Sequence, residues 1–350
     1  MGNSRRNFLL IENATFTDGT DTVYTSIYAD GESVSFDGKL IYALALDGIP
    51  QNGEVDIDVT PYFIPQGSDV KVYGEVGSFS FIDGEVTLDT GDTVKTMTYN
   101  INNGQVNDKV ASARLNYIAA QINTVDPDIV LLGEAHNYET SNYNIAMSDL
   151  TEKCDVSYGI VEFTAEESTN VILYNTEKFT LLNSEYLELG YGKAGEFDAV
   201  WKRDAVIAKF KRISDNREIV AAATHISETN YSDQIGTLLM HIRDNYEDVD
   251  YRIVAGDLNI QNKDLYGDGS STGHKGRFQN PDFTDIFYTD ANVSANGENV
   301  DTTATFPKTP KIIDYIYTTN FNAKNYQVLT GGQASNASDH NAVYAELVLN

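Results

Sequence analysis

The sequence from about Thr93 onward alternates short apolar runs with segments of helical periodicity, and this pattern restricts the possible folds most strongly. Several runs are apolar at consecutive positions, as in strands buried on both faces of a sheet. Apolar residues recur at helical spacing in the segments 108–125 and 232–246. The pattern predicts an α/β (α+β) fold, a layered sandwich with sheets inside and helices outside. The clearest runs are VKTMTYNIN, DIVLLGEAH, VILYN, AVIAKFKR, EIVAAATHIS, YRIVAGDLN, IIDYIYTT and AVYAELVLN.

The first 92 residues have a different pattern, with short strand-like runs and no useful helical segment. Gly, Asp, Asn or Pro separates these runs at the spacing typical of an all-β sandwich or barrel. We therefore expect two domains, a small all-β, sandwich-like domain in residues 1–92 and a larger domain in residues 93–350. The first contains no histidine and no catalytic constellation. It is interpreted as an accessory domain that docks on a larger assembly, such as a virion or cell envelope, or binds carbohydrate, with self-association also open.

Polar side chains follow strand after strand of the larger domain. The motif GDLN alone decides little, because Asp and Asn are also common turn formers. A charged group at the edge of a buried sheet is costly unless it is paired, hydrated or bound to metal. Six such ends converging on one edge would form a site suited to a hard cation and to proton transfer. The polar groups are Asn100, Glu134, His225, Asp257 with Asn259, Asp314, and Ser338 to His340.

The ordered motifs TYNIN, LLGEAH, THIS, GDLN, IIDYIY and SDHNAV resemble the endonuclease/exonuclease/phosphatase superfamily, the deoxyribonuclease-I-like proteins. The resemblance covers residues of about 93–350. It implies a four-layered α/β sandwich of two packed mixed sheets flanked by helices. It also implies hydrolysis of phosphodiesters or phosphomonoesters with a divalent metal, Mg²⁺ or Mn²⁺.

The resemblance assigns metal binding to one group of these residues. Glu134 would be the main metal ligand, and Asn100 and Asp339 would help to hold the metal or its waters. Asp257 would orient or deprotonate the attacking water. Asn259 would donate a hydrogen bond to the scissile phosphate.

The resemblance assigns proton transfer to the histidines. His340 would contact the phosphate and stabilise the transition state, with Asp314 fixing its tautomer. His225 stands where some branches place a second histidine that serves as general acid, and Glu196 is a candidate partner for it. Gly133 departs from the family pattern, because most relatives have Gln before the metal-binding Glu.

Three basic residues are candidates for substrate binding. Arg203 precedes the strand DAVIAKF and matches a position that faces substrate in several branches. Lys275 and Arg277 lie in a Gly-rich segment after GDLN, where they would meet a phosphate backbone or belong to a solvated loop.

Composition restricts partners and location. The chain has 24 basic and 52 acidic residues, a net charge of −28, which argues against a protein that coats DNA irrespective of sequence. A metal enzyme is compatible, because a bound cation reverses the local field. Cys154 is the only cysteine, so an intrachain disulfide is impossible. No secretory signal or membrane span is evident, so we expect a cytoplasmic, virion-associated or non-classically exported protein.

The sequence leaves three functions open. The first is a metal-dependent phosphodiesterase acting on nucleic acid, most simply DNA, as a DNase-like endonuclease. The second is a phosphatase or phospholipase of the same superfamily, of the inositol-phosphate or sphingomyelin type. The third is a catalytically inert binding or structural protein, for example part of a larger assembly.

Overall fold

The structure is a computed structural model, and it describes most of the chain after residue 92. The chain divides into two compact units, residues 1–93 and 94–350. The described parts of the second unit are residues 94–102, 105–107, 109–136, 146–164, 167–193, 200–261, 275–278 and 286–349. In the first unit only strand segments are described.

The described segments of the first unit pair in antiparallel fashion. Five of them form a sheet in the order β2-β1-β5-β8-β9, and β3 pairs with β4 and β6 with β7. That these segments build a sandwich, and that the unit docks on a partner, remain predictions. The strands are β1 (Phe16–Thr17), β2 (Val23–Tyr24), β3 (Ile27–Phe36), β4 (Lys39–Leu46), β5 (Val55–Val59), β6 (Tyr62–Phe63), β7 (Val72–Tyr73), β8 (Gly77–Ile82) and β9 (Glu85–Leu88).

The second unit contains two mixed six-stranded sheets. The first sheet has the order β14-β15-β13-β10-β23-β22, and β10 runs parallel to β13. The second sheet has the order β16-β17-β18-β19-β21-β20, and β18 runs parallel to β19. The strands of the first sheet are β10 (Thr93–Asn100), β13 (Ile129–Gly133), β14 (Tyr158–Val161), β15 (Val171–Asn175), β22 (Phe321–Leu329) and β23 (Ala342–Leu349). Those of the second sheet are β16 (Phe179–Lys193), β17 (Val200–Arg212), β18 (Glu218–His225), β19 (Tyr251–Asp257), β20 (Thr289–Asp290) and β21 (Asp314–Thr319).

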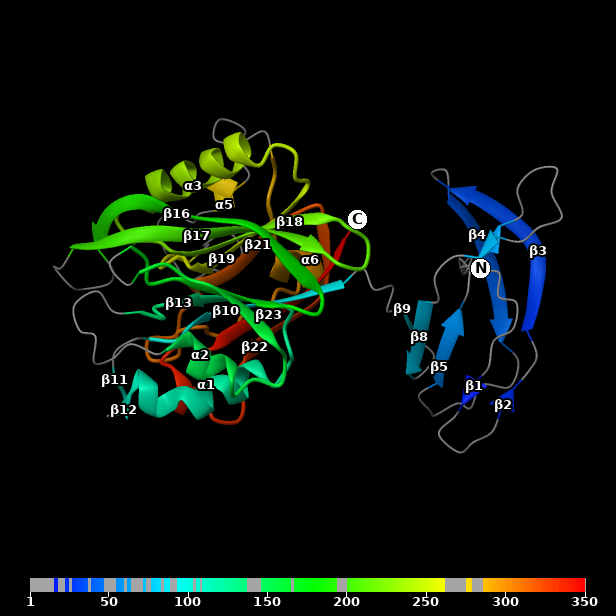
Figure 1. The fold of residues 1–350 in the computed structure, drawn as a ribbon, viewed down its shortest axis with the longest axis horizontal. Coiled ribbons are helices and arrows are strands. Elements are labelled where there is room, and N and C mark those ends of the chain that lie inside the picture. Colours follow the sequence, from blue (N-terminus) through cyan, green and yellow to red (C-terminus); the bar gives the residue numbers. More distant parts are fainter. Residues whose placement is uncertain are drawn as a thin grey trace. The chain divides into compact units, whose positions relative to one another are not determined.

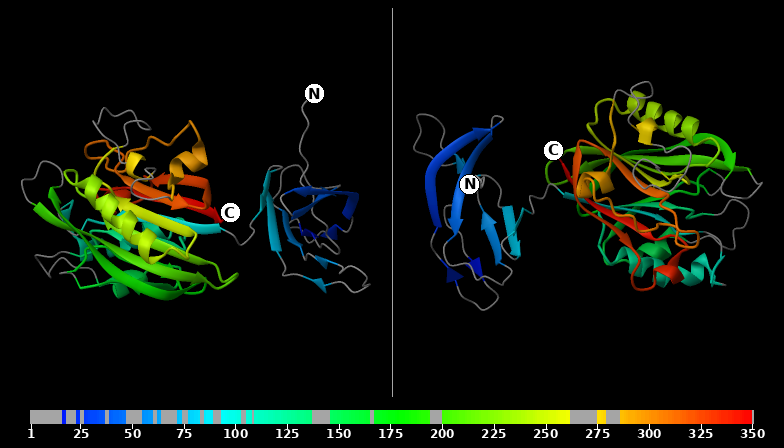
Figure 2. Two further views of the ribbon diagram at one scale, coloured as in Figure 1. Left: turned by 90° about the horizontal axis from the view of Figure 1, so that it is seen from above. Right: turned by 180° about the vertical axis from the view of Figure 1, so that it is seen from behind.

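Helices cover the outer faces of the two sheets (Figures 1 and 2). The helices α1 (Leu115–Ile122) and α2 (Met147–Thr151) share an apolar cluster with the first sheet. The helices α3 (Tyr231–Asn245) and α5 (Lys275–Phe278) cover the second sheet in the same way. A third apolar cluster fills the space between the sheets. These layers confirm the predicted α/β sandwich of two packed mixed sheets.

Short elements complete the second unit. The expected helix over 108–125 begins only at Leu115, after the strand pair β11–β12 and the 3₁₀ turn η1. No helix among the described residues is long and apolar enough to cross a membrane. The remaining elements are β11 (Gln105–Val106), β12 (Lys109–Val110), η1 (Ala111–Arg114), α6 (Ala291–Asn296) and α7 (Ala334–Ala337).

Gly256 explains part of the GDLN motif. It lies opposite Thr224 in the parallel pair β18–β19 and has a φ of 152°. A Cβ atom at this position would lie 1.7 Å from the carbonyl oxygen of Thr224. The glycine therefore permits the close approach of the two strands whose ends carry His225 and Asp257.

We expect Gly256→Ala to lower the free energy of unfolding by about 2–3 kcal/mol or more, because backbone atoms must move to admit the methyl group. Chemical denaturation measures this change. Gly331→Ala is the matched control, since a Cβ there has no neighbour within 4 Å. Equal stability of the two variants would contradict the assigned strand approach.

Candidate active site

Three acidic or basic side chains form one row across the second sheet. The strand register places His225 opposite Asp257, and Asp257 opposite Asp314. Directly paired residues of neighbouring strands project from the same face. All three side chains are nearly inaccessible to solvent. The ends of β18 and β19 and the beginning of β21 therefore supply a buried row of polar groups.

The first sheet supplies the opposing groups. Asn100, at the end of β10, pairs with Gly133, so Glu134 follows immediately beside it. Glu134 has a φ of 49°, an uncommon conformation for a residue with a long side chain. Such backbone strain often marks functional sites. Asp339 and His340 lie between α7 and β23, which is hydrogen-bonded to β10.

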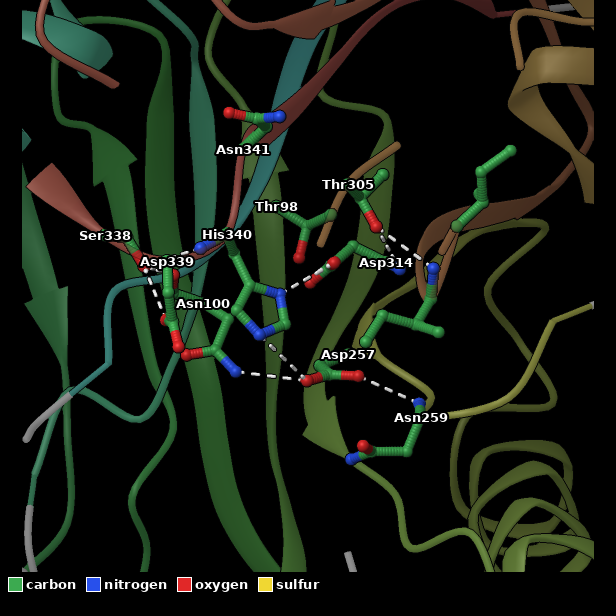
Figure 3. A network of polar contacts seen from close by, with 12 residues as sticks. Thr98, Asn100, Asp257, Asn259, Thr305, Asp314, Ser338, Asp339, His340 and Asn341 are labelled. Atoms are coloured by element: carbon green, nitrogen blue, oxygen red, sulfur yellow. Dashed lines mark hydrogen bonds and ion pairs between the residues drawn. The ribbon is translucent and has the colours of Figure 1, made fainter. Parts of the chain in front are cut away.

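The Asp257 carboxylate joins the two sheets (Figure 3). Its Oδ2 accepts a hydrogen bond from Asn100 Nδ2 at 3.1 Å. The same oxygen lies 3.5 Å from His225 Nε2 and 3.7 Å from His340 Nε2. Its Oδ1 accepts a hydrogen bond from the Asn259 backbone at 2.8 Å. Residues from three distant parts of the chain, together with the nearby Asn259, thus surround one carboxylate.

His340 is held as an imidazolium by Asp314. Its Nδ1 lies 2.9 Å from Asp314 Oδ2, so the ring donates this hydrogen bond. Burial opposes a charge on the ring, but the adjacent Asp314 carboxylate, with Asp257 further off, raises the pKa of His340 to about 10. At neutral pH the ring therefore presents a positively charged Nε2–H toward Asp257.

Asp257 retains its proton more readily than an ordinary aspartate. Burial raises its pKa to about 7, with a further contribution from the negative charge of Asp314 and a smaller one from Glu134. His340 acts in the opposite direction. A carboxylate with a pKa near neutrality is well matched to accept and release protons at physiological pH.

His225 is neutral in this environment. Burial lowers its pKa well below the ordinary value, and the charges of Arg203 and His340 lower it further. Asn259 Nδ2 donates to His225 Nε2 at 2.8 Å, which places the ring proton of the neutral form on Nδ1. That nitrogen lies 3.7 Å from Glu134 Oε1. His225 must therefore gain a proton before it can protonate a leaving group.

The donor set fits a divalent cation. Two groups place their ligand atoms within 4.8 Å of one another, Glu134 with His225 and Asp257, and Asp257 with Asp314 and His340. Carboxylates outnumber cationic groups at this edge, and a hard cation relieves their mutual repulsion. Asn100 Nδ2 donates to Glu134 Oε1 at 2.9 Å, whereas its Oδ1 accepts a hydrogen bond from Asn102 N at 3.0 Å and keeps a second lone pair for a cation.

Asp339 lies at the same edge but outside both of these groups. Its Oδ1 accepts a hydrogen bond from Asn102 Nδ2 at 2.8 Å, and Asn102 N donates to Asn100 Oδ1 at 3.0 Å. Asp339 is therefore connected to the predicted ligand Asn100 through Asn102.

The predicted substrate-binding residues differ in their placement. Arg203 is buried and acts electrostatically on His225, so it belongs to the site's surroundings. Arg277 is half-buried in α5, the short helix that covers the second sheet beside α3. The side chain of Lys275 and all of Glu196 lie outside the described residues.

Sequence reasoning missed Thr305 as a residue that positions Asp314. Its buried hydroxyl accepts hydrogen bonds from the backbone of Ile313 at 3.0 Å and Asp314 at 3.1 Å. Its carbonyl accepts a hydrogen bond from Asn341, the neighbour of His340, at 2.7 Å. The only sequence signal was a threonine shortly before the strand with Asp314, a pattern too common to interpret.

The model of the Endonuclease/Exonuclease/phosphatase family matches residues 97–340, which include every polar strand end described above. The chain belongs to this family. Its members are metal-dependent phosphoesterases, that is, hydrolases of phosphoester bonds. The resemblance inferred from the motifs is therefore confirmed.

Solved structures show the same fold at low sequence identity. The endonuclease/exonuclease/phosphatase protein of Bacteroides vulgatus has a TM-score of 0.58 and 20% identity, over 74% of this chain and 99% of that one. The mannosyl-6-phosphatase of Bacteroides thetaiotaomicron has a TM-score of 0.56 and 18% identity, over 73% and 100%. The human Nocturnin catalytic domain has a TM-score of 0.52 and 17% identity, over 74% and 95%. Comparison with curated proteins finds no match.

We expect phosphoester hydrolysis to have a bell-shaped dependence on pH. Activity should rise as Asp257 loses its proton, at or below about pH 7 once a cation is bound, and fall as His340 loses its proton near pH 10. Asp314→Asn should shift the alkaline limb to lower pH, because the charge that holds the imidazolium is lost. Profiles of kcat/KM measure both limbs, and an unmoved alkaline limb would exclude the Asp314–His340 assignment.

We expect Thr305→Val to reduce kcat by about 10²-fold, because displacement of a catalytic group by about 1 Å can have this effect. The nearly isosteric valine leaves two buried N–H groups without an acceptor, at a cost of about 1–3 kcal/mol. Thr305→Ser keeps the acceptor and should restore most of the activity. Steady-state kinetics of both variants, with thermal unfolding as a check on folding, test the role of the hydroxyl.

Proposed function

We propose that the chain is a divalent-metal-dependent phosphodiesterase that hydrolyses nucleic acid, most simply DNA, as an endonuclease. The observation that supports this best is the Asp257 carboxylate, with a pKa of about 7, beside the charged ring of His340. A proton acceptor next to a positive charge that Asp314 holds in place suits attack by water on a phosphate.

Glu134 would hold the metal, with Asn100 and Asp339 as further oxygen donors. When bound, Mg²⁺ or Mn²⁺ would neutralise charge on the phosphate. Asp257 orients a water and accepts its proton, because burial brings the pKa of its carboxyl near neutrality. His340 Nε2 donates a hydrogen bond to a phosphate oxygen, and Asn259 Nδ2 donates to another once a proton on His225 Nε2 releases it from that ring. Asp314 keeps His340 charged and correctly oriented throughout.

His225 protonates the departing oxygen in this proposal. Its pKa is low in the structure, so the ring must take up a proton from solvent when the substrate binds. A phosphate dianion or monoanion next to the ring raises the pKa of an imidazole, since opposite charges favour the charged form. Sugar alkoxides are poor leaving groups, and a general acid at this position suits a phosphodiester of a nucleotide.

A phosphomonoesterase acting on a small phosphorylated molecule is the second candidate. The net charge of −28 disfavours long polyanions at a distance, so binding of nucleic acid depends on local cations such as Arg203. A small phosphate ester requires less positive surface. For the first unit we propose docking on a larger assembly or on carbohydrate, which would concentrate the enzyme near its substrate.

We expect Asp257→Asn to lower kcat on the true substrate by about 10²–10⁴-fold, because the amide cannot accept the proton of water. The assay should compare supercoiled plasmid, single-stranded DNA, RNA, sphingomyelin, inositol phosphates and a hexose 6-phosphate. Nicking of plasmid that depends on Asp257 supports the nuclease. Turnover of the hexose phosphate alone favours the second candidate, and unchanged turnover in the variant contradicts the mechanism.

We expect EDTA to abolish hydrolysis and Mg²⁺ or Mn²⁺ to restore it, because the carboxylates at this edge lack enough positive partners to bind a phosphate unaided. A dialysed sample titrated with each cation measures the requirement. Full activity in excess chelator would refute the role given to Glu134.

A further inference from the structure

Arg114 is a buried cation to which the proposed chemistry assigns no role. It ends the turn η1 directly before α1, and its side chain is fully inaccessible to solvent. A buried charge is expensive unless it is well hydrogen-bonded. An apolar side chain would fill this space at a lower cost in free energy. The hydrogen bonds of Arg114 therefore indicate what the guanidinium contributes.

The guanidinium of Arg114 connects two loops of the site. Its Nη1 donates to the carbonyl of Ile101 at 3.0 Å and also to the carbonyl of Ala337. Its Nη2 donates to the carbonyl of Asn102. Ile101 and Asn102 follow Asn100 directly, whereas Ala337 lies two residues before Asp339. One planar group therefore fixes the backbone behind two predicted metal ligands.

Asn102 connects the same loops on the side of the ligands. It donates from Nδ2 to Asp339 Oδ1 at 2.8 Å and from its backbone to Asn100 Oδ1 at 3.0 Å. Ser338 adds a hydrogen bond from its hydroxyl to the carbonyl of Asn100 at 2.7 Å. The two loops are thus joined at the backbone and at the side chains that would bind a cation.

Electrostatic attraction also favours the contact of Arg114 with the two loops. Burial lowers the pKa of Arg114, whereas Tyr99 and the negative charges of Asp339 and Glu134 favour its charged form. The attraction between these opposite charges adds to the hydrogen bonds that hold the two loops. Ligands that are correctly spaced before a cation arrives bind it more tightly.

We propose that Arg114 and Asn102 form a loop clamp, a positioning device that fixes the spacing of the Asn100 and Asp339 loops and thereby sets the affinity for a divalent cation. Neither residue contacts substrate in this role. The inference rests on the proposed function, because it requires a metal bound between these loops.

The test is titration of the full chain with Mn²⁺, without substrate, by isothermal titration calorimetry. Arg114→Lys keeps the positive charge but loses the fork that reaches both loops. We expect its Kd for Mn²⁺ to rise by about 10–100-fold, the usual effect of removing a group that supports a metal ligand. Asn102→Gly keeps the left-handed backbone of residue 102, which has a φ of 49°, and should weaken binding in the same direction.

Arg252→Lys is the matched control. Arg252 is also buried and donates to a backbone carbonyl, that of Tyr246, at 2.9 Å. It lies near the beginning of β19, whereas Asp257 ends that strand. This variant should lower the melting temperature and leave the Kd for Mn²⁺ unchanged, which separates loss of stability from loss of metal affinity.

The outcomes distinguish this inference from the proposed function. Weaker binding in either clamp variant with normal binding in the control supports the clamp. If Arg114→Lys does not fold, Asn102→Gly decides alone. Normal Mn²⁺ binding by the folded clamp variants overturns the clamp but leaves the proposed function standing. A wild-type chain that binds no Mn²⁺ overturns the clamp and the metal-dependent mechanism together.

Discussion

The rest of the site depends on the contacts that the buried carboxylate of Asp257 makes with residues of both sheets. It lies within 3.7 Å of an amide and two imidazoles that come from both sheets. A carboxylate in the interior is stable only with such partners. The sheets must therefore pack in one register for its charge to be accommodated, so the requirements of folding and of chemistry coincide at this residue.

The two carboxylates beside His340 have different roles because their surroundings differ. Asp314 forms a short, direct hydrogen bond with His340 and keeps the ring charged. Asp257 stands further from the ring, and burial together with the negative charge of Asp314 raises its pKa. The loop clamp of Arg114 and Asn102 adds a similar support, because it holds the backbone next to the predicted metal ligands Asn100 and Asp339.

The sequence predicted the layered sandwich because buried strands and amphipathic helices have distinct periodicities. The prediction from the sequence was less accurate where local contacts determine the backbone conformation. The helix expected over 108–125 begins at Leu115, since Lys109–Val110 pair with Gln105–Val106 as strands and Ala111–Arg114 form a 3₁₀ turn. Thr305 and Arg114 also escaped notice. A threonine or arginine has no local pattern that indicates which distant backbone group it will bind.

The amino-acid sequence shows which polar residues follow the buried strands, and their order matches a known family of phosphoesterases. It does not show that His225, Asp257 and Asp314 form one row or that Asn100 reaches Asp257 from the other sheet, which is seen in the folded chain. The reason is that strand order, register and sheet packing are long-range properties. They bring together residues far apart in the chain, and the shifts in pKa arise only from that proximity.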